Sequence, residues 1–390
     1  MKNAIIGQSG GPTSVINSSL LGIIEGLKQR EDINVVYGMQ YGIEGFLEGK
    51  IVDLYMYSKD NSFLNNLAGS FLGTCRYKLV ENEEIITKIF NILDSYNIGY
   101  FYYIGGNDSM DTIKVLHNYA SANNIDIQFI GIPKTIDNDL VGTYTSPGYA
   151  SSAKFIITAL IGQIYDVYSY NTSSITIVET MGRDTGWLAA AGCYINGVVE
   201  NCIDYILVPE MLFDEETFFL HLQNKIKIKK HIFIIVAEGL KNKEGEYLST
   251  PNQPKDAFGN VSRAGIGQYL KNRIVKRFSI KVNVNELGLL QRSNIQVHSI
   301  FDKEKAYNQG FYATTLNKSG VMVSLQRSDT IFSISEVDIH DCANRMQALD
   351  IKYIDRNNFT IHDTFIEYLK PLIDINTSTL KYFFKTRRNK

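Results

Sequence analysis

Two carboxylates and a lysine lie on one short polar segment of this 390-residue chain, residues 133–139. The segment carries Lys134, Asp137 and Asp139, and it follows the apolar run 127–132. Such a run, ended by proline, is typical of a buried strand that leads into a loop, and ligands of open α/β sheets bind beyond the carboxyl ends of strands. The charges therefore suit phosphoryl transfer. The same residues also fit ordinary turn chemistry, in which Asp and Asn side chains bond their own backbone.

Two glycine-rich loops could hold phosphates. Residues 7–13, Gly-Gln-Ser-Gly-Gly-Pro-Thr, join a predicted first strand to a helix whose apolar residues recur at helical spacing. The sequence Gly105-Gly106-Asn107-Asp108-Ser109 repeats this design after the predicted strand 99–104. Adjacent glycines let backbone N–H groups approach an anion, and a helix N-terminus adds partial positive charge. The first loop lacks the lysine of a P-loop and is equally consistent with a tight turn, and Asp108 is equally consistent with a helix cap.

Three further strand ends carry polar residues. Met181-Gly182-Arg183 follows the predicted strand 175–178, and its arginine could fork onto a phosphate. Glu238 follows the strand-like run 232–237, and Arg292 follows the apolar residues 287–290. Carboxylates and amides beside a glycine turn can also hold Mg²⁺. Five such loops in one chain are difficult to explain as turn chemistry alone.

The elements that must position these loops alternate along the chain. Strands are predicted at 3–6, 99–104, 127–132 and 175–178, with strand-like runs at 203–208 and 232–237. Several of them are followed by a polar or glycine-rich loop and a helical pattern, which predicts βαβ units in doubly wound, mostly parallel sheets. A chain of 390 residues exceeds the usual size of a single core, so two α/β domains are expected.

Composition narrows the kinds of partner. The net charge is −2, which gives no field to attract nucleic acid or an anionic membrane. Four widely spaced cysteines indicate neither a disulfide framework nor a zinc site. No signal peptide or membrane-spanning run is seen, so a cytoplasmic protein with small-molecule ligands is expected. The basic run 225–230 is expected to be solvated rather than an anion site.

Taken together, these motifs resemble the phosphofructokinase family, and more closely its pyrophosphate-dependent branch. They follow one another in the family's order over roughly residues 1–330. The combination is specific even though each motif is not. The matching segments are 9–12, 69–76, 105–109, 133–139, 181–183, 238–239 and 291–292.

The resemblance implies a role for each site residue. Asp137 would be the general base that takes the proton from the 1-hydroxyl of fructose 6-phosphate. The sugar phosphate would be bound by Thr135, Asp137, Met181, Gly182, Arg183, Glu238 and Arg292. The phosphoryl donor would be bound by Gly11, Arg76, Gly106 and Ser109. A bridging Mg²⁺ is expected near Asn107 and Asp139.

Two catalytic positions separate the family's branches by donor. ATP-using members generally have glycine at the position of Asp108, and a small residue at that of Lys134. A carboxylate at Asp108 would repel the α-phosphate of a nucleotide, whereas pyrophosphate ends before reaching it. Lys134 can neutralise charge that develops during transfer. The pair predicts pyrophosphate as donor, and a reversible reaction in glycolysis or gluconeogenesis.

The resemblance further implies two domains facing one cleft and a homo-oligomer, either a dimer or a tetramer. The donor domain would contain residues 1–145 plus about 288–340, and the sugar-phosphate domain residues 146–287. Residues 341–390 would form a C-terminal helical extension. The alternatives are an ATP-dependent 6-phosphofructokinase, which Asp108 and Lys134 oppose, and a non-catalytic regulatory subunit of the same fold.

Several positions depart from the family pattern, among them a leucine at position 289 or 290 where the family has histidine or tyrosine. Asn107, a neutral oxygen ligand, stands where many relatives have aspartate, so Asp139 is expected to carry more of the Mg²⁺ coordination. Two basic residues that a neighbouring subunit often lends to the sugar 6-phosphate fall on Ser174 and Asn283. Lys281 or Arg292 could compensate. Without compensation, these changes leave open a different sugar phosphate, such as a heptulose phosphate, or an inactive subunit paired with an active one.

Overall fold

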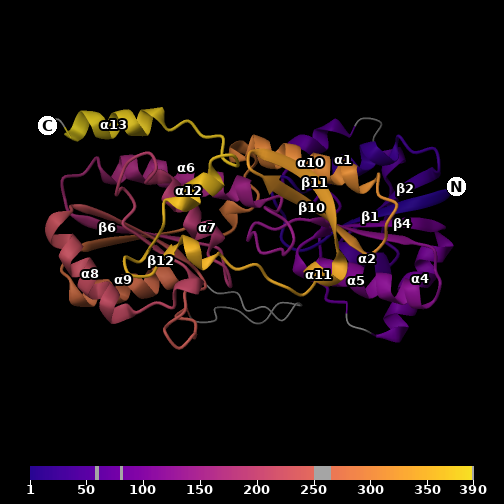
Figure 1. Ribbon diagram of the computed structural model, residues 1–390, viewed down its shortest axis with the longest axis horizontal. Helices are drawn as coiled ribbons and strands as arrows, with labels where there is room; N and C mark the ends of the chain where they lie inside the picture. Colours follow the sequence, from indigo (N-terminus) through magenta and orange to yellow (C-terminus); the bar gives the residue numbers. More distant parts are fainter. Residues whose placement is uncertain (58–60, 80–81, 250–264, 389–390) are drawn as a thin grey trace. The chain divides into compact units, whose positions relative to one another are not determined.

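The computed structural model describes residues 1–57, 61–79, 82–249 and 265–388 (Figure 1). The described chain forms two compact units. The first contains residues up to 149 together with 292–347, and the second contains 150–249, 265–291 and 348–388. Each unit has its own sheet. The predicted two-domain α/β architecture is therefore what the chain adopts.

A seven-stranded sheet forms the centre of the first unit, in the order β11-β10-β5-β4-β1-β2-β3. The inner strands are parallel, whereas β10–β11 and β2–β3 pair antiparallel at the two edges. The carboxyl ends of the parallel strands therefore share one edge, where polar loops can meet. The strands are β1 Lys2–Gln8, β2 Ile33–Met39, β3 Ile51–Asp53, β4 Ile98–Gly105, β5 Gln128–Pro133, β10 Val321–Ser328 and β11 Ile331–Asp338.

Alternate residues of these strands face two separate cores. Ile5, Phe101 and Phe129 pack with the residues of α4 and α5, whereas Ile6 and Tyr102 pack with those of α1. Both faces of the sheet are thus covered, which is why its parallel strands read as nearly continuous apolar runs. The helices of this unit are α1 Ile16–Leu27, α2 Gly42–Leu47, α3 Leu54–Tyr57, α4 Glu83–Ser95, α5 Asn107–Ala122, α10 Ile300–Ala313 and α11 Ile339–Cys342.

The second unit is built on a four-stranded, wholly parallel sheet in the order β7-β8-β6-β9. Every residue of β6, β7 and β8 is buried, while the edge strand β9 is largely exposed. The strands are β6 Ser174–Thr180, β7 Tyr205–Leu207, β8 His231–Ala237 and β9 Lys281–Glu286. The helices are α6 Tyr149–Val167, α7 Trp187–Ala190, α8 Glu215–Ile228, α9 Ile266–Arg277, α12 Thr364–Leu369 and α13 Ser378–Arg388.

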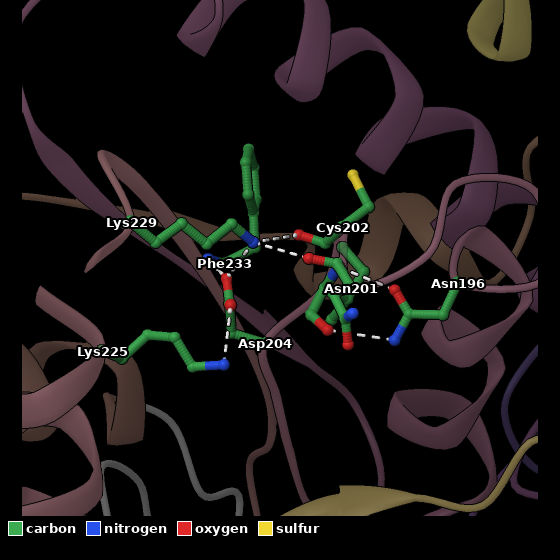
Figure 2. Close-up of polar contacts among 8 residues, drawn as sticks. Asn196, Asn201, Cys202, Asp204, Lys225, Lys229 and Phe233 are labelled. Atoms are coloured by element: carbon green, nitrogen blue, oxygen red, sulfur yellow. Dashed lines mark hydrogen bonds and ion pairs between the residues drawn. The ribbon is translucent and has the colours of Figure 1, made fainter. Parts of the chain in front are cut away.

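A buried charge joins β7, β8 and the end of α8 (Figure 2). The Asp204 carboxylate is fully enclosed and accepts a hydrogen bond from the Phe233 backbone N–H at 3.0 Å. Lys229 Nζ lies 2.8 Å from its Oδ2, and Lys225 Nζ lies 3.6 Å from its Oδ1. Two lysines of the basic run 225–230, which we expected to be solvated, therefore balance an internal carboxylate.

The sequence predicted a helical extension over residues 341–390. The structure shows that this segment is only partly helical. Besides α12 and α13 it contains an antiparallel pair, β12 Ile354–Asp355 and β13 Thr360–Ile361. It packs on the second unit through aromatic side chains, with the rings of Trp187 and Tyr368 5.4 Å apart. Short 3₁₀ helices complete the chain at Ser62–Asn66, Ala191–Ile195, Pro209–Met211, Gly288–Gln291, Ile295–Val297 and Ile351–Tyr353.

All six strands predicted from the sequence are present, as β1, β4, β5, β6, β7 and β8. The antiparallel edge strands were not predicted, because half-exposed β11 and short β3 lack a long apolar run. Within the described residues, no helix combines the length and the apolar character that crossing a membrane requires.

Candidate active site

The loop after β5 is held in place by its backbone. Lys134 N–H donates to the Gly105 carbonyl at 2.9 Å, and Thr135 N–H donates to the Pro147 carbonyl at 3.2 Å. Asn138 adopts a left-handed conformation with φ 55°, and its Oδ1 accepts from Ser146 N–H at 3.0 Å. The turn chemistry considered from the sequence is thus present. It fixes the loop that presents the carboxylates.

Asp137 and Asp139 flank this left-handed residue, and both are half-buried. Asp137 N–H donates to Thr135 Oγ1 at 3.1 Å, and the Asp139 carbonyl accepts from Gln347 N–H at 2.8 Å. Both carboxylates influence the charge of Lys134, so they act on one local field. The sequence expectation that these residues gather at one strand end holds.

Lys134 is the most unusual charged group of the site. Only 3% of the residue is exposed, and its Nζ donates to the Gly11 carbonyl at 2.7 Å. Burial lowers the pKa of Lys134 to about 7, with Arg292 and Arg76 acting in the same direction and the two aspartates opposing them. A buried ammonium with so few acceptors is stabilised when an anion binds beside it.

Two arginines add to this positive field. Burial, and after it the charge of Arg76, lowers the pKa of Arg292. A Cβ at Gly10 would lie 3.2 Å from Lys134 Nζ, and one at Gly11 would lie 3.2 Å from Arg292 Nη1. The absence of side chains on these glycines therefore leaves space next to two cations. A cradle with this charge suits a small polyanion.

The second glycine loop lies beside the first. Helix α5 starts at Asn107, and Gly106 at its N-cap accepts from the N–H groups of Ser109 and Met110, each at 3.0 Å. Asp108 stands in the first helical turn, where the helix dipole favours a carboxylate. Ser109 is buried behind it. The predicted helix and the predicted position of Asp108 at its start are both observed.

Asn107 fits a ligand for a hard cation. Its Oδ1 is buried and accepts no hydrogen bond from any residue that the structure describes. An amide oxygen in that state can bind a divalent ion. The described residues hold no group of three or more His, Cys, Asp or Glu side chains that could cage a metal.

In the second unit, the loops after β6 and β8 meet because these strands are neighbours. Gly239 N–H donates to the Gly182 carbonyl at 3.2 Å, and Glu238 N–H donates to the Thr180 carbonyl at 2.9 Å. Gly182 has φ 119°, a conformation that favours glycine. Met181, Gly182, Arg183 and Glu238, predicted to bind the sugar phosphate, thus form one group.

Arg183 is held by a neighbouring carboxylate. Its Nε lies 2.6 Å from Asp184 Oδ2, and the Tyr247 hydroxyl donates to the other carboxylate oxygen. Burial alone would raise the pKa of Asp184, but the hydrogen bonds from Tyr247 and Arg183 outweigh it and hold that pKa below its usual value. Asp184 therefore stays charged and restricts the guanidinium.

Two buried side chains had no role assigned from the sequence, although Gln291 belongs to the matching segment 291–292. Gln291 is fully buried, and its Oε1 accepts from Met181 N–H at 3.3 Å. The Glu179 carboxylate accepts from Gly265 and Gly267 N–H at 3.0 and 2.8 Å, which fastens the start of α9 to the end of β6. Glu179 was hidden in a strand, where a single acidic residue gives no signal of its own.

The charge deficit at Ser174 and Asn283 has a counterpart in the structure. Both residues line a groove of about 560 Å³ along the edge strand β9. Lys271 and Lys281 line the same groove, and Lys281 Nζ lies 5.9 Å from the centre of the Tyr170 ring. Thr176, whose buried Oγ1 is bonded by no described residue, lines this groove as well. Positive charge is thus present in this groove, at Lys271 and Lys281 rather than at Ser174 and Asn283.

The fold and these loops define a phosphofructokinase-type phosphotransferase. The chain belongs to the phosphofructokinase family, whose family model matches residues 3–316. The predicted family is thereby confirmed.

Several relatives carry more particular names. The pyrophosphate–fructose 6-phosphate 1-phosphotransferase of Methylococcus capsulatus is 31% identical over 386 residues, which cover 96% of this chain and 92% of that protein. The enzyme of the same name from Halomonas elongata is 31% identical over 385 residues, with 95% and 91% covered. The crystal structure of a pyrophosphate-dependent phosphofructokinase from Marinobacter aquaeolei superposes with a TM-score of 0.86 at 31% identity, covering 96% and 92% of the two chains.

Proposed function

We propose that this enzyme reversibly transfers a phosphoryl group from pyrophosphate to the 1-hydroxyl of fructose 6-phosphate, giving fructose 1,6-bisphosphate and phosphate. The observation that carries the proposal is the convergence of Arg76, Lys134 and Arg292 beside two bare glycines. The names of the most similar relatives agree with this reaction. It would serve glycolysis or gluconeogenesis in the cytoplasm.

Pyrophosphate is favoured over ATP by two residues. Asp108 lies in the first turn of α5, next to the Gly106 cap, where it would repel a third phosphate. Lys134 is buried against the Gly11 carbonyl. A nucleotide would have to displace the Lys134 ammonium, whereas pyrophosphate would be bound by it. Pyrophosphate would be bound by Gly11, Arg76 and the N-terminal turn of α5.

The acceptor hydroxyl is activated by Asp137 as general base. Thr135 Oγ1 accepts from the Asp137 backbone N–H, and the charge of Asp137 raises the pKa of nearby Lys134. General-base catalysis is typically worth about 10²–10⁴ in rate. In the second unit, Arg183, which Asp184 holds, would bind the sugar phosphate with Met181, Gly182 and Glu238.

A divalent metal ion belongs to the family's chemistry, and we propose Mg²⁺. The ion supplies charge neutralisation on the transferred phosphoryl group when bound. Asn107, whose buried Oδ1 accepts no described hydrogen bond, and Asp139 would hold it. The carboxylate of Asp137 then remains available for the proton.

We further propose a homo-oligomer in which one copy lends Lys271 and Lys281 to the sugar phosphate bound by another. The two lysines line the groove that also contains Ser174 and Asn283. The first unit would then be the donor domain, and the second the sugar-phosphate domain. This arrangement supports an active enzyme rather than an inactive regulatory subunit.

The test is a coupled assay with fructose 6-phosphate and Mg²⁺, supplying pyrophosphate in one reaction and ATP in another. We expect turnover with pyrophosphate only, and a fall of about 10²–10⁴ in kcat for Asp137→Asn. The double variant Asp108→Gly/Lys134→Gly should lose pyrophosphate activity and gain ATP activity. Turnover of the native enzyme with ATP would overturn the assigned donor, and full activity of Asp137→Asn would overturn the assigned base.

A further inference from the structure

Arg76 lies on a segment without helix or strand. Residues 67–76 follow the 3₁₀ helix Ser62–Asn66 and run as turn and irregular chain. Such a segment gains no rigidity from a regular ladder of backbone hydrogen bonds. Contacts outside regular secondary structure must therefore hold Arg76 beside Lys134 and Arg292, because a guanidinium without a fixed position cannot preorganise an anion site.

Asn17 makes three hydrogen bonds to the backbone of this segment. It is the second residue of α1 and is fully buried. Its Nδ2 donates to the carbonyls of Leu67 and Gly69 at 2.8 and 2.6 Å, and its Oδ1 accepts from Phe71 N–H at 3.0 Å. One side chain thus bonds three backbone groups spread over five residues of the segment.

Gln8, the last residue of β1, completes the arrangement. It is also fully buried, and its Nε2 donates to Asn17 Oδ1 at 3.0 Å. Its Oε1 accepts from Leu72 N–H at 2.9 Å. Every polar atom of the two amide side chains is therefore hydrogen-bonded, and their partners among the described residues are the backbone of this segment and each other.

Hydrogen bonds also hold the two residues before Arg76. Gly10 N–H donates to the Cys75 carbonyl at 3.0 Å, and Thr74 Oγ1 donates to the Gly10 carbonyl at 2.7 Å. Gly10 is the glycine whose missing Cβ leaves space beside Lys134 Nζ. The same contacts therefore set the segment and the glycine cradle at a fixed spacing.

We infer that Asn17 and Gln8 are positioning residues for the phosphoryl donor, acting through Arg76. Neither touches the donor. Together they convert the irregular segment 67–76 into a rigid wall that holds the guanidinium against the site of Lys134 and Arg292. The inference rests on the proposed function only in naming pyrophosphate as the anion.

The experiment compares Asn17→Ala with Asn3→Ala in the full-length protein. Asn3 is a matched control, because it is a buried amide at the opposite end of β1, bonded to Tyr96 and Val35. Calorimetry with pyrophosphate should show a Kd raised about 10–100-fold by Asn17→Ala and less than about twofold by Asn3→Ala. The KM for fructose 6-phosphate should change less than the KM for pyrophosphate.

A double-variant cycle separates positioning from general damage. In an Arg76→Ala background, Asn17→Ala should weaken pyrophosphate binding less than about twofold, because the group it positions is gone. A full additional loss in that background, or equal losses for both substrates, would overturn the inference. Should Asn17→Ala fail to fold, Gln8→Met removes the Leu72 bond at nearly constant volume and is judged by the same criteria.

Hydrogen exchange gives a readout that does not need activity. The peptide covering residues 67–76 should exchange faster in Asn17→Ala than in Asn3→Ala or native protein. Native protein that binds no pyrophosphate would contradict the proposed function, and the exchange data would still decide the role of Asn17. Unchanged exchange in Asn17→Ala would contradict the positioning role alone.

Discussion

Lys134 shows how a single side chain can link burial to ligand binding. Its ammonium is enclosed, close to two arginines, and has the Gly11 carbonyl as a hydrogen-bond acceptor. Burial therefore holds its pKa near 7, well below that of a lysine in water. A bound polyanion offsets the burial of the charge, so anion binding and protonation of Lys134 favour one another.

This coupling predicts proton uptake on pyrophosphate binding. At pH 8 the free enzyme holds Lys134 mostly neutral, since pH 8 lies above its pKa of about 7. The bound anion raises that pKa, so up to about one proton is taken from the buffer, and at pH 6 this uptake vanishes because the lysine is already charged. Calorimetry in buffers of different ionisation enthalpy measures it.

Lys134→Met is the matched comparison, because pyrophosphate brings its own proton equilibria. The difference in uptake between native and variant protein isolates the lysine. An identical dependence on buffer for the two proteins at pH 8 would show that Lys134 does not titrate on binding.

At the scale of elements, parallel strands bring distant loops to one edge. The β5 and β4 ends join residues 133–139 to 105–109 through the bond from Lys134 N–H to the Gly105 carbonyl. The β6 and β8 ends join Gly182 to Gly239 in the same way. Neighbouring strands in the sheet, rather than neighbouring residues in the chain, therefore decide which candidate residues act together.

At the buried Asp204, we expect a substitution to destabilise the second unit. Asp204→Ala removes the acceptor of Phe233 N–H and the counter-ion of Lys229, and should lower the free energy of unfolding by roughly 1.5–3 kcal/mol. Glu216→Ala removes an exposed ion pair with Arg277 and should lower the free energy of unfolding far less. Urea unfolding of both variants measures the difference. Equal effects would contradict the structural role of Asp204.

At the scale of the whole molecule, the lysine groove along β9 predicts cooperation between copies. Lys271→Ala/Lys281→Ala should raise the KM for fructose 6-phosphate roughly 10–100-fold, as expected for lost charged hydrogen bonds, with little change for pyrophosphate. Steady-state kinetics measures both constants. The matched control is Lys276→Ala, an exposed lysine in the last turn of α9 that does not line this groove.

Mixing the lysine variant with Asp137→Asn tests whether the groove serves a second copy. In a mixed oligomer, the Asp137→Asn copy has intact lysines and the lysine variant has an intact base. Together they should regain activity with a near-native KM. No recovery, with mixed oligomers demonstrated by two affinity tags, would mean that the lysines act within their own copy or not at all.

Several features of this protein were readable from the sequence because they depend on local order. Apolar runs located six strands, four of them ended by glycine or proline, and helical spacing after residues 7–13 and 105–109 located α1 and α5. Their shared order along the chain identified the family. The kinds of motif and their order along the chain were sufficient to predict these elements and the family, since local backbone conformation depends on neighbouring residues.

Only the tertiary structure decided which polar side chains are internal and what they bond. Gln8 and Asn17 look like any amides, yet they fasten a segment more than 50 residues away. Lys225 and Lys229 looked solvated, yet they balance buried Asp204. The physical reason is that the desolvation of a polar group depends on everything packed around it, and those neighbours come from distant parts of the chain.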